Sequence, residues 1–489
     1  MRPVSLLASR PLRSSSVPYP SERASRLGHV PIVNSQAVQD AFARWEVAQA
    51  TPADENRVTS LCRPLEVLDN AGISDGIRFA ISVDGSDTEV EATREHPTIK
   101  VGYVRVAASF IDFDKLHEAG TGHFVNPHLL RESHQHAAFD RALPGSGLII
   151  PGSTGVDTWR QELNRFLQET KFDQDSEQTL ADMLLALHGS PNAPATTAPL
   201  RRCPVCQASD AQLSGGRIDV PKSGTNCPEC GQKVYLGDVL RTEEEYMPEG
   251  SNRSSLTRLM LVAERLTSLG YMQLLFEDAH SYDVLGRTIF ITDGPLGLYG
   301  TVAPLKRRFQ NYLAEFAKHC AANNRPAIPL VVGVEKSGTF VDHAQLISHL
   351  IEPGHVMLLT TEYINRITGR PAGNPYGSDE FYGRRFIYRT MSGGILVFTV
   401  PPKPGVTPYG DPDGELWSSY PTLRPVCEVL EQVQTRLYEN AVIPVALAHS
   451  AASLPLGVGQ SVLRALVQQS LGLPARSQIR QTGPFAGPR

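Results

Sequence analysis

The chain has 489 residues, of which 41% are hydrophobic and 20% charged, so it can bury a sizeable core and is neither disordered nor collagen-like as a whole. No apolar run approaches the roughly 18–20 residues that a membrane-spanning helix requires. The net charge of −5 excludes a wholly basic coat for nucleic acid, whereas a nucleic-acid enzyme needs only a local basic groove.

Composition changes along the chain predict six segments. They are a flexible leader (1–35), the first part of a main domain (36–150), a helical insertion with a linker (151–200), a four-cysteine module (201–242), the second part of the main domain (243–472) and a flexible tail (473–489). The leader is rich in Ser and Arg, which fits either a flexible terminus or a transit peptide, and we favour the terminus.

Hydrophobic periodicity predicts helices over residues 36–70, from 254 to about 276 and over 303–323. Residues 115–150 hold five of the 14 histidines and are predicted to form a polar surface loop.

Short apolar runs that end in polar residues predict the strands of the main domain. The run over 76–86 ends in Asp84-Gly85-Ser86, and a run over 101–113 can pair with it as an antiparallel hairpin. Later runs end in Asp293-Gly294-Pro295 and in Glu335-Lys336-Ser337. Strands and helices that follow one another in this way predict an α/β fold.

The cysteines follow a metal-binding pattern. Four of the seven form two C-x2-C pairs separated by twenty residues: Cys203, Cys206, Cys227 and Cys230. Two such pairs supply the four thiolates of a tetrahedral structural Zn2+ site and leave no open position for chemistry. We therefore predict a zinc ribbon that stabilises a small insertion, and this metal pattern favours a reducing, cytoplasmic location over a secreted disulfide protein.

Two aspartates are the main candidates for chemistry. Asp84 and Asp293 each follow an apolar strand and precede a glycine. The carboxyl ends of neighbouring strands meet at one edge of an α/β sheet, so the two carboxylates could share Mn2+ or Mg2+ ions. Two-metal hydrolysis of a phosphodiester needs such carboxylates, although a single Asp-Gly pair is more often an ordinary turn.

Other polar residues could complete that site. Glu264, inside the long helix, is the best third acid, with Glu277 and Asp278 as alternatives. Lys336 could neutralise phosphate charge and His449 could contact phosphate or metal. The competing interpretations are a salt-bridged helix acid, a solvated lysine and a packed histidine.

The order of these motifs resembles that of the NurA nucleases. The residues that carry the resemblance are Val83-Asp84-Gly85-Ser86, Ile291-Thr292-Asp293-Gly294-Pro295-Leu296, Gly333-Val334-Glu335-Lys336-Ser337 and Ile443 to His449. The resemblance implies an RNase H-like mixed sheet flanked by helices, metal roles for Asp84, Asp293 and Glu264, and auxiliary roles for Lys336, His449 and Tyr388.

The same resemblance implies 5′-to-3′ exonuclease and single-strand endonuclease activity on DNA, together with a HerA-like hexameric ATPase partner. The setting would be DNA end processing in repair or in anti-phage defence. We also expect a homodimer and no membrane partner. The four-cysteine module departs from the minimal family pattern and leaves the third acid open.

Two other functions fit parts of the sequence. An actin-like ATP-binding enzyme also uses Asp-Gly turns at strand ends, but a convincing pair of glycine-rich phosphate loops is not found, and the chain has no G-x-x-x-x-G-K-[ST] motif. A non-catalytic, zinc-stabilised interaction subunit would need the cysteine module but not the strand-end acids.

Overall fold

The computed structural model describes residues 30–45, 52–69, 76–119, 132–173, 175–277, 282–322, 329–370, 376–434, 442–454 and 458–473. Asp278 and most of the predicted leader and tail lie outside these ranges. The chain divides into two units, Met1–Asp54 and Glu55–Arg489. In the described part of the first unit, α1 (Val30–Val33) and α2 (Gln36–Phe42) bury none of their residues.

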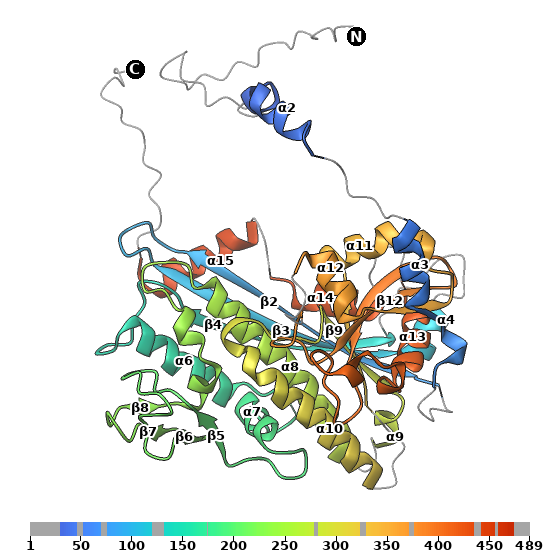
Figure 1. Ribbon diagram of the computed structural model, residues 1–489. Helices are drawn as coiled ribbons and strands as arrows, with labels where there is room; N and C mark the ends of the chain where they lie inside the picture. Colours follow the sequence, from blue (N-terminus) through green and yellow to red (C-terminus); the bar gives the residue numbers. More distant parts are fainter. Residues whose placement is uncertain are drawn as a thin grey trace. The chain divides into compact units, whose positions relative to one another are not determined.

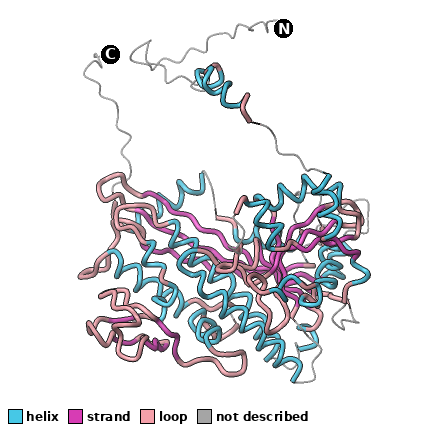
Figure 2. Tube along the Cα trace, viewed as in Figure 1, coloured by secondary structure: helices cyan, strands magenta, loops and turns pink. Residues whose placement is uncertain are grey.

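The second unit is built on a mixed sheet (Figure 2). In the described residues nine strands pair in the order β1-β11-β12-β13-β10-β9-β2-β3-β4. Their bounds are β1 (Cys62–Pro64), β2 (Phe79–Glu91), β3 (Lys100–Asp112), β4 (His134–Pro144), β9 (Thr288–Asp293), β10 (Leu330–Glu335), β11 (His355–Leu358), β12 (Arg384–Arg389) and β13 (Ile395–Val400). The predicted mixed α/β sheet flanked by helices is confirmed, whereas its RNase H-like description stays a prediction.

The centre of the sheet combines parallel and antiparallel pairs. β2 pairs with β9, and β9 with β10, in parallel, whereas β2, β3 and β4 form an antiparallel meander. Strands that precede the cysteine module in the sequence and strands that follow it therefore share one sheet. Alternation along β2 sends Ile81 and Val83 to one apolar cluster and Ala80 to another, so both faces of the sheet are covered.

Helices cover both faces of the sheet. On one face α8 (Arg253–Glu277) lies along β2 and β3, and α11 (Thr339–Ile347) packs on β13 (Figure 1). On the other face α13 (Leu423–Gln432) and α14 (Ile443–Ala452) pack on β10 and β2. The other helices of the unit are α3 (Pro52–Ser60), α4 (Phe113–Ala119), α6 (Gly155–Glu169), α7 (Leu180–His188), α9 (Tyr282–Leu285), α10 (Lys306–Ala322), α12 (Thr361–Thr368) and α15 (Val458–Ser470).

The cysteine module has little regular structure of its own. Within it β7 (Thr225–Asn226) pairs with β8 (Lys233–Val234) in antiparallel, and β6 (Ile218–Pro221) pairs with β5 (Thr197–Leu200), which lies in the predicted linker before the module. It packs beside α6 and α7, away from the main sheet (Figure 1). Its apolar residues join the same cluster as α8, so the module extends the main core rather than building a separate one.

Three local predictions are wrong. The run over 76–86 does not end in Asp84-Gly85-Ser86, because pairing with β3 continues β2 to Glu91. Residues 36–70 do not form one helix, because α3 ends at Ser60 and the chain then enters β1. Residues 134–144 are not a loop: they form edge strand β4, which is only partly buried and depends on backbone pairing with β3. A strand held by pairing rather than burial carries a weak hydrophobic pattern. No helix in the described ranges is long and apolar enough to cross a membrane.

Candidate active site

Asp84 and Asp293 lie on adjacent parallel strands. The register of β2 and β9 pairs Val83 with Thr292, so the next residue of each strand is the aspartate. Asp84 is 4% exposed, and its Oδ1 accepts a hydrogen bond from the Gly85 amide at 2.8 Å. The parallel pairing thus places two carboxylates side by side at the carboxyl end of β9. Asp84 itself is in the middle of β2, which continues to Glu91 in pairing with β3.

His449 reaches this edge from α14. Pro444 stands in the first turn of that helix, where its missing N–H costs nothing, and α14 packs on β2, β3 and β9. The His449 Nδ1 lies 2.8 Å from Asp84 Oδ2, across 365 residues of sequence. Potential ligand atoms of Asp84, Asp293 and His449 all lie within 4.8 Å of one another.

Lys336 supplies the positive charge. It follows β10 directly, and its Nζ lies 2.6 Å from Asp293 Oδ2. Burial and the neighbouring Asp293 charge raise the pKa of Asp84, whereas His449 and Lys336 lower that pKa. Carboxylates and imidazole are common ligands of divalent cations. A bound cation would also relieve the electrostatic repulsion between the two carboxylates. These three residues therefore fit a divalent metal ion.

Glu264 approaches the same edge from the opposite face of the sheet. It is 4% exposed on α8, and a Cβ added to Gly85 would lie 2.6 Å from its Oε1. Burial, and then the charges of Asp84 and Asp293, raise the pKa of Glu264 to about 8, whereas Arg265 opposes the shift. Glu264 is thus near the aspartates, although it is outside the group of three whose ligand atoms converge.

The other predicted positions are not brought to this edge. Glu277 accepts a hydrogen bond from Gln273 at 2.6 Å and lies thirteen residues along α8 from Glu264, about 20 Å at the helical rise. Tyr388 lies on β12, separated from β9 by β13 and β10. Its hydroxyl donates to Glu431 at 2.7 Å, so it has a partner outside the carboxylate group.

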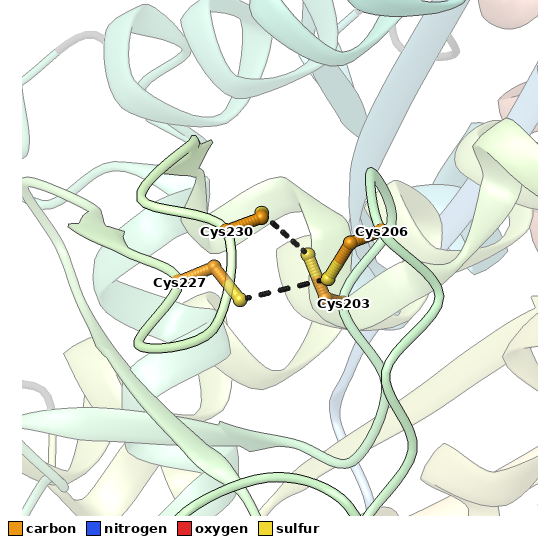
Figure 3. A group of neighbouring side chains, drawn as sticks. All are labelled: Cys203, Cys206, Cys227 and Cys230. Atoms are coloured by element: carbon orange, nitrogen blue, oxygen red, sulfur yellow. Dashed lines mark hydrogen bonds between the residues drawn. The ribbon is translucent and has the colours of Figure 1, made fainter.

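The four cysteines form a second metal-competent group (Figure 3). The Sγ atoms of Cys203 and Cys230, and those of Cys206 and Cys227, are each 3.9 Å apart, and all four cysteines are free thiols. A tetrahedral Zn2+ with Zn–S bonds of about 2.3 Å would separate its sulfurs by about 3.8 Å. These two distances fit Zn2+, and all four Sγ atoms lie within 4.8 Å of one another.

Sequence reasoning missed two buried arginines, which contact Glu264 and Glu335. Arg265 is 3% exposed, lies 3.5 Å from Glu264 and donates to the Pro295 carbonyl at 3.2 Å. Arg385 is 2% exposed and donates to Glu335 Oε1 at 2.5 Å. The only signal in the sequence is an arginine in an apolar helix or strand, which does not identify its partner.

Comparisons with known proteins give little further guidance. No protein-family model matches the chain, and no curated protein matches it. The NurA nuclease from Sulfolobus solfataricus aligns over 92% of this chain and 98% of its own, with 9% identity and a TM-score of 0.35. A second structure, of NurA, aligns over 90% of this chain and 96% of its own, with 9% identity and a TM-score of 0.26. TM-scores this low do not establish a shared fold.

Proposed function

We propose that this protein is a metal-dependent DNA nuclease that hydrolyses phosphodiester bonds where β9 ends and its pairing with β2 stops. The observation that carries the proposal is the convergence of Asp84, Asp293 and His449 within 4.8 Å. The three residues come from separate elements, and this donor set matches the oxygen-rich sites of metal-dependent hydrolases.

In this proposal Asp84 and Asp293 hold the metal, which is Mn2+ or Mg2+ and supplies Lewis-acid stabilisation of the phosphate and an activated water. Lys336 would pair with the phosphate in place of Asp293 when that carboxylate holds the metal. His449 contacts Asp84 through Nδ1, so its Nε2 is available to the scissile phosphate. Glu264 becomes a third acid when it loses its proton, which a two-metal mechanism would require.

The test is cleavage of linear and single-stranded DNA with Mn2+ or Mg2+, against a control without added divalent metal. We expect Asp84→Asn and Asp293→Asn to lower the rate at least a hundredfold, because each removes a metal ligand. Asp140→Asn is the matched control: Asp140 lies on β4 and pairs with Arg105 at 2.8 Å. Metal-independent cleavage, or full activity in both active-site variants, would contradict the proposal.

The finer features rest on the NurA resemblance alone. We propose a HerA-like hexameric ATPase partner, a homodimer, 5′-to-3′ polarity and a role in DNA end processing. Co-purification with such an ATPase tests the first, and end-labelled substrates test the polarity. The nuclease assay is repeated with the ATPase before an inactive protein is assigned to the alternatives. Tight ATP binding would then favour the actin-like enzyme, and partner binding alone the interaction subunit.

A further inference from the structure

A pocket of about 470 Å³ opens on the face of the sheet that α11 covers, opposite to the face from which α14 brings His449 to Asp84. Four aromatic side chains and one ion pair contribute to its lining: Tyr299, Phe340, Tyr376, Phe381, Glu335 and Arg385. Its volume lies in the range of small-molecule sites, and none of these residues belongs to the carboxylate group.

Arg385 has an unused hydrogen-bond donor in this pocket. Its guanidinium carbon lies 3.8 Å from the Phe340 ring centroid and 5.0 Å from that of Phe381. Its Nε donates to Glu335, but its buried Nη1 has no hydrogen-bond partner in the described part of the chain. An unpaired donor on a buried cation is costly, so the site is suited to an acceptor brought by a ligand.

The pocket and the carboxylate group share two chain segments. Pro295 lines the pocket two residues after Asp293, and Glu335 lines it one residue before Lys336. In each of the two segments a glycine separates the residues of the two sites along the chain: Gly294 after Asp293, and Gly338 after Ser337. Their φ angles of 81° and 107° favour glycine. A Cβ built on either would meet nothing within 4 Å, so the sheet edge between the two sites is open at these positions.

We propose that this pocket binds one unpaired nucleobase of the nucleic-acid strand whose phosphate lies at the carboxylates. The proposal rests on the proposed nuclease function. Aromatic rings stack on any base, and the Arg385 Nη1 donates to a ring nitrogen or carbonyl of that base. Arg370, an exposed residue of the lining with its guanidinium carbon 4.9 Å from the Tyr376 ring centroid, meets the adjoining phosphate.

The experiment uses a single-stranded oligonucleotide with one fluorescent 2-aminopurine, mixed with the full chain without added Mn2+ or Mg2+ so that no cleavage occurs. Stacking in the pocket quenches the fluorescence. We expect Tyr376→Ala to bind about 5- to 150-fold more weakly and to lose the quench, and Arg370→Ala to bind more weakly. Tyr376→Phe retains the ring and should restore both signals. Tyr103→Ala, a half-buried tyrosine on β3, is the matched control.

The outcomes separate this proposal from the nuclease proposal. A quench that persists in Asp84→Asn and disappears in Tyr376→Ala supports the pocket even if no variant cleaves DNA. Unchanged affinity and quench in both Tyr376→Ala and Arg370→Ala overturn the pocket, while metal-dependent cleavage by wild type still supports the nuclease. If Tyr376→Ala does not fold, Arg370→Ala decides, because its exposed side chain can be removed without disturbing the core.

Discussion

At the residue scale, Gly85 controls how closely Glu264 approaches the carboxylate edge. A methyl group at this position would lie 2.6 Å from Glu264 Oε1 and 2.7 Å from Met260 Cγ. Both neighbours belong to α8, which packs along β2, so neither can withdraw without shifting the helix or changing rotamer. The absence of a side chain here is therefore a packing requirement of the site.

Gly85→Ala should lower the free energy of unfolding by about 1–3 kcal/mol, because the methyl group overpacks this contact. It should also weaken Mn2+ binding if Glu264 is the third acid. Chemical denaturation measures the first effect and calorimetric titration the second. The control is Gly76→Ala, where an added Cβ meets nothing within 4 Å. Equal stability of the two variants would show that the side chains of α8 accommodate the methyl group without cost.

Glu243 provides a pH prediction away from the candidate active site. Burial, and then the charge of Asp238, raise its pKa from 4.5 to about 8. The folded protein therefore keeps a proton on Glu243 between these pH values, where the unfolded chain has lost it. Its contribution to stability falls as pH rises through this window.

Glu243→Gln removes that titration. The variant should become more stable than wild type as pH rises from about 4.5 to 8, by a few kcal/mol at the upper end. Denaturation at several pH values measures the difference. Glu244→Gln, at an exposed neighbour that pairs with Arg241 at 2.8 Å, should show little pH dependence. A constant difference between Glu243→Gln and wild type would mean that Glu243 is ionised in the fold.

At the element scale, a buried ion pair joins α6 to the segment after the cysteines. Arg160 of α6 donates through Nε and Nη2 to the two oxygens of Asp238, at 2.9 and 2.8 Å. The side chains are 3% and 0% exposed. Two parallel hydrogen bonds fix the relative position of the two elements, and the loss of one partner leaves a buried charge unpaired.

Arg160→Ala should therefore lower the free energy of unfolding by about 3–5 kcal/mol. Arg165→Ala, on the same helix with an exposed pair to Glu162 at 3.0 Å, should cost less than about 1 kcal/mol. Thermal and chemical denaturation measure both. Similar losses in the two variants would argue that helix propensity, and not the buried pair, dominates at α6.

The cysteine module makes a second prediction at this scale. We expect one Zn2+ per chain, because the four sulfur atoms converge within 4.8 Å of one another. Metal analysis of purified protein should find it, and Cys206→Ser should lose it together with stability. Cys62→Ser, outside the group, should keep the metal. A full metal content in Cys206→Ser would rule out a four-cysteine site.

At the scale of the whole molecule, the candidate active site forms only when distant segments assemble. Asp84 comes from β2, which precedes the cysteine module in the sequence, and Asp293 comes from β9, which follows it. His449 comes from α14. A cation that Asp84 and Asp293 hold stabilises the folded state and not the unfolded chain. Ligand binding of this kind is measured as a rise in the unfolding temperature.

Mn2+ at a hundred times its Kd should add about 2.7 kcal/mol of stability to wild type. The gain should shrink strongly in Asp84→Asn and Asp293→Asn, because each loses a ligand, and should persist in Asp140→Asn. Differential scanning fluorimetry with and without Mn2+ tests this without any activity. An equal rise in unfolding temperature with Mn2+ in all three variants would mean that Mn2+ binds away from Asp84 and Asp293.

The sequence by itself determined the ends of β9 and β10, the cysteine group and the helix of Glu264, whereas the end of β2 depends on its pairing with β3. These signals are local: an apolar strand before Asp-Gly, two C-x2-C turns, and a buried helical face. Only the tertiary structure decided the rest. Edge strand β4 depends on pairing with β3, Tyr388 has its partner in α13, and Arg385 has its partner in β10. Such contacts join residues that are far apart in the chain, and local periodicity does not specify which side chains face each other across a sheet.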